Sequence, residues 1–303
     1  GVYTSRDGGQ KWQFTSNLPV MQLYTVAVDM QEPFYHVYGG TQDNGTWSGP
    51  IGTRYSDGIA NEDWMFVSGG DGFYAVADPT DPDIIYSQSQ YGVLYRTDRK
   101  SGEQRRIQPW QPQDGEFPPY RWNWSAPFVI SPHDPETLYF GANVVFRSDD
   151  RGTSWERISP DLTRGIDRNE LPLQGKIPEP DTIDLHASTA MYGNLHSLAV
   201  SPLRRGLIAA GTDDGLIQVT RDGGKNWQRS DSFPGVPDMM KVGKVTWSGT
   251  DEGTLFAVFD GHKDNRFEPF VVRSDDYGMT WRNITSNLPE FGPSRSIAVH
   301  PRN

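Results

Sequence analysis

Four aspartates lie in short polar stretches where their carboxylates could do chemistry. They are Asp43 in TQDNG, Asp71 in GGDG, and Asp213 and Asp214 in TDDG. Glycosidases place two carboxyl groups about 5–10 Å apart, one as acid and the other as base or nucleophile. Two of Asp43, Asp71 and Asp213 are therefore candidates for the acid and base of a glycoside hydrolase.

Amide, aromatic and cationic side chains occupy the same stretches and their neighbours. Such groups bind sugar hydroxyls, peptide groups and the apolar faces of ligands. The alternative stays open that each of these residues only ends a strand and binds no ligand. For His196 the two interpretations are a side chain hydrogen-bonded to the backbone and a catalytic base. The candidate binding residues are Gln42, Asn44, Gln90, Arg121, Asn123, Trp124, Asn143, His196 and Asp214.

Other kinds of chemistry find no support in the composition. The chain has no cysteine, so disulfides, thiolate metal sites and cysteine nucleophiles are excluded. No two histidines have metal-ligand spacing, and we expect neither a metal nor a cofactor. The formal charge of −11 disfavours nucleic acid as a partner. No apolar run reaches the roughly 18 residues that a membrane span needs.

A repeated octet indicates the elements that would position these residues. The pattern is Ser/Thr-x-Asp-x-Gly-x-x-Trp, and each copy lies between two strand-like runs, which predicts a hairpin. The Asp is expected to accept hydrogen bonds from its own turn, and the Trp to pack back over it. We interpret these residues as structural: Asp7, Asp150, Asp222 and Asp276, with Trp12, Trp155, Trp227 and Trp281.

A second repeat, out of phase with the octets, joins two further strands through a proline-bearing turn. Examples are VADPTDPDIIYS and ISPHDPETLYF. Each unit then has strands A to D, with the proline turn between A and B and the octet between C and D. Weaker octets at 55–64 and 95–107 fill the gap in the series. Four-stranded units repeated at about 40–50 residues predict an all-β fold, a β-propeller.

The units can be counted along the chain. Residues 1–15 supply a partial blade, full blades are expected at about 20–65, 73–110, 127–160, 195–230 and 242–287, and residues 294–303 supply one A strand. We predict a single propeller over 1–303 whose ring is incomplete. Seven blades are favoured, and six are the alternative. Because the sequence opens and ends inside motifs, we expect it to be part of a longer protein.

The octets resemble those of the Asp-box, or BNR-repeat, propellers. The stretches GGTQDNGTWSGP, GGDGF, RWNWSAPFVISPHDP and SPDLT look like bacterial sortilin-like or BNR-repeat "glycosyl hydrolase" proteins. The resemblance implies a secreted or periplasmic bacterial protein, with a protein or glycan partner or a place in a larger assembly. The arginine-bearing motif of sialidases is missing, so that activity is rejected. We favour a non-catalytic binding propeller, with a xyloglucanase-like or other glycoside hydrolase as the alternative.

The alternation of strand direction separates the two kinds of connection. The A–B and C–D turns share one face, and the B–C loops and D–A links share the other. The candidate site residues therefore fall on the face opposite the octets. The long D–A link at 161–193, which includes His186, is expected at the channel mouth as a lid or docking loop, or else as a disordered insertion.

Overall fold

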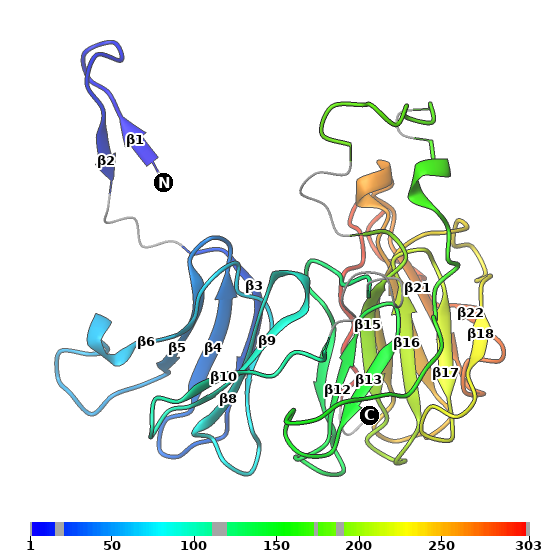
Figure 1. Ribbon diagram of the computed structural model, residues 1–303, viewed down its shortest axis with the longest axis horizontal. Coiled ribbons are helices and arrows are strands. Elements are labelled where there is room, and N and C mark those ends of the chain that lie inside the picture. The colour runs from blue at the N-terminus through cyan, green and yellow to red at the C-terminus, as the bar shows by residue number, and fades with distance from the viewer. Residues whose placement is uncertain (1, 16–20, 111–119, 173–174, 186–190, 301–303) are drawn as a thin grey trace.

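The part of the chain that the structure describes folds into six antiparallel sheets, which follow one another along the sequence (Figure 1). The computed structural model describes residues 2–15, 21–110, 120–172, 175–185 and 191–300. Five sheets have four strands, and the first is a hairpin of β1 (Val2–Thr4) and β2 (Gln13–Thr15). The fold is an all-β propeller, as predicted.

We number the four-stranded sheets as blades 1 to 5 in chain order. Blade 1 contains β3 (Leu23–Val28), β4 (His36–Thr41), β5 (Gly45–Pro50) and β6 (Met65–Ser68). Blade 2 contains β7 (Ala75–Ala77), β8 (Ile84–Ser89), β9 (Val93–Asp98) and β10 (Gln104–Arg106). Blade 3 contains β11 (Phe128–Ile130), β12 (Leu138–Gly141), β13 (Val145–Ser148) and β14 (Glu156–Arg157).

The last two blades follow the same order. Blade 4 contains β15 (Leu195–Val200), β16 (Ile208–Thr212), β17 (Ile217–Thr220) and β18 (Gln228–Ser230). Blade 5 contains β19 (Val242–Trp247), β20 (Leu255–Phe259), β21 (Phe270–Ser274) and β22 (Arg282–Asn283). The helical elements of the described residues are 3-10 turns, at Asn61–Asp63, Gln90–Gly92, Arg168–Glu170 and His262–Asp264. No helix in this part of the chain is long and apolar enough to cross a membrane.

The hydrophobic core lies between neighbouring blades. Tyr86 of blade 2 and Phe140 of blade 3, both fully buried, belong to one cluster. A second cluster joins Ala209 of blade 4 to Val245 of blade 5. Because both faces of a stacked blade are covered, its inner strands carry nearly continuous apolar runs such as LIAAG.

The expected A strand at 294–303 is wrong for the residues that the structure describes. Residues 294–300 form no strand. A lone strand leaves its backbone groups without ladder partners, and the hairpin β1–β2 offers it no B strand to pair with. The six sheets fit the six-bladed alternative rather than the favoured seven.

Each octet closes its turn with the same set of hydrogen bonds. Ser274 Oγ donates to Asp276 Oδ1 at 2.8 Å and accepts from the backbone N–H of Gly278 at 2.8 Å, while the N–H of Thr280 donates to Asp276 Oδ1 at 2.8 Å. Burial alone would raise the pKa of Asp276, but the hydrogen bonds from Thr280 and Ser274 lower it. The corresponding bonds occur at Asp7, Asp150 and Asp222.

The octet turn also docks on the preceding blade. Trp155 Nε1 donates to the carbonyl of Ile107 at 2.6 Å, and Trp227 Nε1 to that of Ile158 at 3.3 Å. Both isoleucines directly follow the D strand of the preceding blade. In blade 5 the bond runs the other way, from Ser230 Oγ of β18 to the carbonyl of Gly278 at 2.7 Å.

The burial of the octet tryptophans follows from this docking. The sequence predicts that Trp155 and Trp281 are largely buried beside their turns, but both are half-buried, as is Trp227. Trp12 of the hairpin, which precedes every four-stranded blade, is 64% exposed. The octet is therefore a joint between blades as well as a turn.

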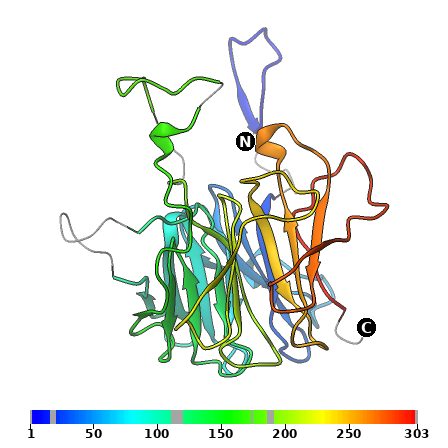
Figure 2. The same ribbon diagram turned by 90° about the vertical axis from the view of Figure 1, so that its right-hand side faces the viewer.

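The two kinds of connection lie at opposite ends of the blades (Figures 1 and 2). Arg151 of an octet turn forms an ion pair with Asp78 of the A–B turn in blade 2, at 2.9 Å. At the other end, Asp71 of a D–A link accepts a hydrogen bond from the backbone N–H of Asp43 in a B–C loop. Contacts at each end thus join the connections that the strand alternation places together.

We predict that Gly224→Ala destabilises the protein more than Gly223→Ala. Both glycines have positive φ, +103° and +75°, where an alanine costs on the order of 1–2 kcal/mol. A Cβ at Gly224 would also overlap the carbonyl oxygen of Ile158, whereas a Cβ at Gly223 meets nothing within 4 Å. Thermal unfolding of the two variants makes the comparison, and equal losses would contradict the docking.

We predict that Asp276→Ala lowers the free energy of unfolding by about 1–3 kcal/mol, because it removes the hydrogen bonds from Ser274 and Thr280, each of which contributes about 0.5–1.5 kcal/mol. Because the folded pKa of Asp276 is lowered, this contribution is present above the unfolded value of 3.8 and is lost as the pH falls below it. Urea denaturation at pH 7 and pH 3 measures it. If the free energies of unfolding of variant and wild type differed by as much at pH 3 as at pH 7, the ionised carboxylate would not be the source of the stability.

Candidate functional site

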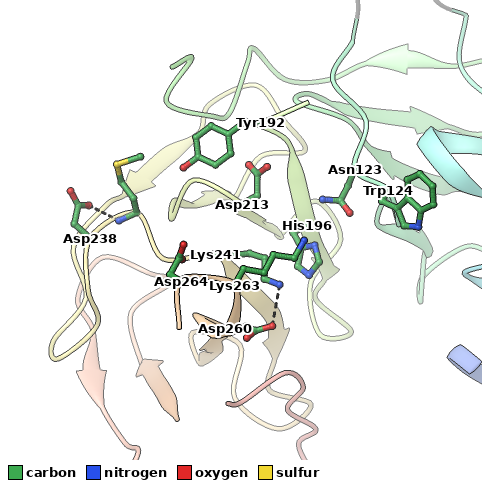
Figure 3. A pocket seen from close by; sticks show the side chains of 11 residues that line it. Asn123, Trp124, Tyr192, His196, Asp213, Asp238, Lys241, Asp260, Lys263 and Asp264 are labelled. Atoms are coloured by element: carbon green, nitrogen blue, oxygen red, sulfur yellow. Dashed lines mark hydrogen bonds and ion pairs between the residues drawn. The ribbon is translucent and has the colours of Figure 1, made fainter. Parts of the chain in front are cut away.

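A cavity of about 630 Å³ opens at the end of the propeller that carries the B–C loops and D–A links (Figure 3). It lies where connections of blades 3, 4 and 5 meet. Its volume is within the range of small-molecule sites. The lining residues are Asn123, Trp124, Tyr192, His196, Asp213, Asp238, Met239, Lys241, Asp260, Lys263 and Asp264.

Asp213 is the carboxyl group with the most unusual environment. It follows β16, and its Oδ1 accepts the backbone N–H groups of Gly193 at 3.1 Å and Asn194 at 2.8 Å. These bonds favour the ionised form, but burial opposes it more strongly and Asp214 adds a second negative charge, so that the pKa rises to about 7. Asp213 can therefore hold or release a proton near neutral pH.

Asp260 lines the same cavity and is held in the opposite state. Its carboxylate is buried, with Lys241 Nζ at 3.0 Å and His262 Nδ1 at 2.7 Å. Burial alone would raise its pKa, but the hydrogen bonds from His262 and the charge of Lys241 lower it to about 2. Arg295 Nε adds a weaker contact at 3.9 Å. Asp260 is thus a permanent anion that fixes Lys241 beside the cavity.

His196 of β15 stays uncharged at neutral pH. Burial and the nearby charge of Lys241 lower its pKa to about 3. Its Nδ1 is buried and has no hydrogen-bond partner among the described residues. The hydrogen bond to the backbone that the sequence analysis considered for His196 is therefore not formed at this nitrogen. A neutral imidazole in the wall can donate and accept one hydrogen bond each, but it is a poor base.

Aromatic rings complete the wall. Trp124 is held edge-on by Tyr91, with ring centroids 4.9 Å apart, and by Phe73 at 6.2 Å. Asn123 Nδ2 donates to Asn194 Oδ1 at 2.7 Å. Tyr192 stands across the cavity from Trp124 (Figure 3), and burial raises the pKa of its hydroxyl, which remains protonated. The cavity therefore combines two aromatic rings with polar groups.

Three predicted binding residues hold the long D–A link instead of lining the cavity. Arg121 donates to Asp161 Oδ2 at 2.6 Å, and Asn143 Nδ2 donates to the same oxygen at 2.9 Å. Asp214 Oδ2 accepts the backbone N–H of Arg164 at 2.7 Å. The start of the link is thereby fixed to blades 3 and 4. His186, which we also placed in this link, lies outside the described residues.

The remaining candidates lie at the mouth of blades 1 and 2. Asp71 accepts the N–H of Asp43, the N–H of Asp71 donates to Gln90 Oε1 at 3.1 Å, and Asn44 Nδ2 donates to the Gln42 carbonyl at 2.9 Å. None of these five residues is among the described residues that line the cavity. The structure therefore does not bring Asp43 or Asp71 together with Asp213 there.

Sequence reasoning missed part of the lining. Asp260, Lys263 and Asp264 belong to DGHKDNRFE, which has the composition of the other B–C loops and could have been selected. Tyr192 ends the long link, and Lys241 ends a proline-rich link, so neither shows a motif. In the described part of the chain, no three His, Asp or Glu side chains gather as metal ligands.

Comparisons with known proteins support the fold. No family model matches the chain. The xyloglucanase Xgh74A of Acetivibrio thermocellus is 23% identical over 264 residues, which is 76% of this chain but 28% of that protein. The crystal structure of an ancestral GH74 enzyme superposes with a TM-score of 0.61 at 14% identity, covering 90% of this chain and 32% of that one.

A propeller of another kind is also similar. The crystal structure of Chaetomium thermophilum Sqt1 has a TM-score of 0.51 at 16% identity, covering 89% of this chain and 61% of that one. At these identities the solved structures show the β-propeller fold alone. The chain spans less than a third of the curated xyloglucanase that it matches.

We predict that Asp213→Asn flattens the pH dependence of stability between about pH 4 and 7. The pKa of Asp213 is raised from 3.8 to about 7, so the folded state binds the extra proton and wild-type stability falls as the pH rises through this window. An asparagine can keep the bonds to Gly193 and Asn194 without ionising. Denaturation at several pH values tests this, and parallel curves for the two proteins would show that Asp213 is not desolvated.

Proposed function

We propose that this propeller binds a glycan chain in the cavity between Trp124 and Asp213. The observation that carries the proposal is the combination of Trp124 and Tyr192 with amide, lysine and carboxyl groups in one cavity. Aromatic rings cover the apolar faces of sugars, while polar side chains bond their hydroxyls. The similarity to xyloglucanases makes xyloglucan the first ligand to test.

One observation supports a second candidate function, glycoside hydrolysis. Asp213 and Asp260 line the same cavity, and their environments push the two pKa values apart, to about 7 and about 2. Separated values of this kind accompany an acid and an ionised partner in glycosidases. Asp213 would then protonate the leaving oxygen. The oxygens of Asp260 already bond to Lys241 and His262, which favours the binding function.

The proposal also covers the family, the extent and the cellular location of the domain. The four octets support membership of the Asp-box propellers, and residues 1–303 are proposed as one propeller domain. A sugar polymer of this kind lies outside the cytoplasm, so we place the protein in the periplasm or outside the cell. A protein that took the place of the glycan as the ligand of this site would bind at the same end of the blades.

We predict that Trp124→Ala weakens binding of a xyloglucan oligosaccharide by about tenfold or more, the loss expected when on the order of 1.4 kcal/mol of aromatic contact is removed. Isothermal titration of the full-length protein measures the affinity. Trp12→Ala is the matched control, because Trp12 is an exposed tryptophan of the hairpin far along the chain from the cavity residues. Equal affinities for the two variants, or no binding by wild type, would refute the proposal.

The same preparations separate binding from hydrolysis. If the protein is a hydrolase, wild type releases reducing ends from xyloglucan, and Asp213→Asn abolishes release while binding persists. If it is a binding propeller, neither protein releases them. Release that is unaffected by Asp213→Asn would remove Asp213 from the chemistry.

A further inference from the structure

Two arginines face each other across the outer strands of blade 2. Arg96 of β9 and Arg105 of β10 are directly opposite in the antiparallel register. Like charges in this position destabilise a sheet unless something neutralises them. Arg96 is half-buried and donates to the carbonyl of Arg151 at 2.9 Å, and Arg105 lies 3.8 Å from Glu103 Oε1. Within the described residues Arg96 forms no ion pair.

Blade 5 contains the same pair in a neutralised form. Arg273 of β21 lies opposite Arg282 of β22. The carboxylate of Asp275 bridges them, with Oδ1 at 2.6 Å from Arg273 Nε and Oδ2 at 3.3 Å from Arg282 Nη2. The fold thus shows what a carboxylate does between two arginines at this position of a blade.

The residue of blade 2 that corresponds to Asp275 is bonded to the backbone of its own turn. Asp98 stands two positions after Arg96, as Asp275 stands two positions after Arg273. Its Oδ1 accepts the backbone N–H groups of Lys100 at 2.8 Å and Ser101 at 3.2 Å, and it forms no ion pair with either arginine. The pair in blade 2 therefore has no bridging carboxylate from its own turn.

The surroundings of the pair form a groove. Cavities of about 300 and 360 Å³ both have Arg96 and Arg105 in their walls. The first also contains three acidic residues, Asp81, Asp98 and Glu103, which balance its arginines. The second adds Arg106 and Trp110, which is 68% exposed. β10 is the last strand of its sheet and pairs with β9 alone (Figure 1). No acidic residue is among the described residues that line the second cavity, so it is a cationic groove beside an unpaired strand edge, on a chain with a net charge of −11.

We propose that the outer edge of blade 2 is a docking surface for an extended acidic peptide of a partner protein. The peptide adds along β10, and one of its carboxylates takes the position between Arg96 and Arg105 that Asp275 takes in blade 5. Guanidinium groups match carboxylates in two-bond geometry, and an edge strand supplies main-chain hydrogen bonds that a glycan cannot use in register. This surface is separate from the proposed glycan cavity, with which it shares no lining residue among those described.

The test uses the full-length protein and a fluorescein-labelled peptide, Val-Glu-Val-Glu-Val-Glu, read by fluorescence anisotropy, with the Gln-for-Glu peptide as its uncharged counterpart. Arg105→Gln should weaken binding of the acidic peptide at least tenfold. Arg282→Gln is the matched control, because Arg282 occupies the same place in blade 5 but already has Asp275 as its partner. It should leave the affinity unchanged.

Stability gives a second readout that a purely structural arginine would not produce. Arg105→Gln relieves the repulsion with Arg96 and should raise the melting temperature, whereas Arg282→Gln removes an ion pair and should not raise it. Four results would overturn the proposal: equal binding of the two peptides, equal weakening by both substitutions, a lower melting temperature for Arg105→Gln, or binding of polygalacturonate with none of the peptide. The glycan titration is independent of all of them.

Discussion

The docking of the octet turns of blades 3, 4 and 5 on the preceding blade is the contact on which the rest of the structure depends. Serine or threonine, aspartate and glycine close the turn from within, so that the turn needs no ligand to be stable. Gly152 and Gly224 then approach the preceding blade so closely that a Cβ would overlap Ile107 or Ile158. The repeat along the sequence becomes a repeat of blade against blade in space.

This joint lies at one end of the blades and leaves the other end available for the proposed ligand site. The polar groups of the octet and proline turns bond to one another, as the ion pair of Arg151 with Asp78 illustrates. At the opposite end Asp213 and His196 are desolvated, and the Nδ1 of His196 has no partner among the described residues. Groups of this kind are costly to maintain for stability alone, and they concentrate at functional sites.

The sequence was sufficient for the blades because an octet specifies its own turn within eight residues. It was insufficient for the site because a cavity depends on which loops converge. TQDNG and TDDG look equivalent as sequences, yet Asp43 bonds to Asp71 at the edge of blade 1 while Asp213 enters the cavity. Arg121 and Asn143 have the chemistry of ligand-binding residues, but both are used by Asp161 to fix the long link. Lys241 was missed since only its ion pair with Asp260, 19 residues away, places it at the site.

The central claim is that the ligand site lies at the end of the blades opposite the octets, around Trp124 and Asp213. The measurement that tests it most directly is a crystal structure of the full-length protein with a xyloglucan oligosaccharide. We expect sugar rings against Trp124 with a hydroxyl or glycosidic oxygen at Asp213. Sugar density seated on the octet turns, with the cavity holding solvent alone, would contradict the account.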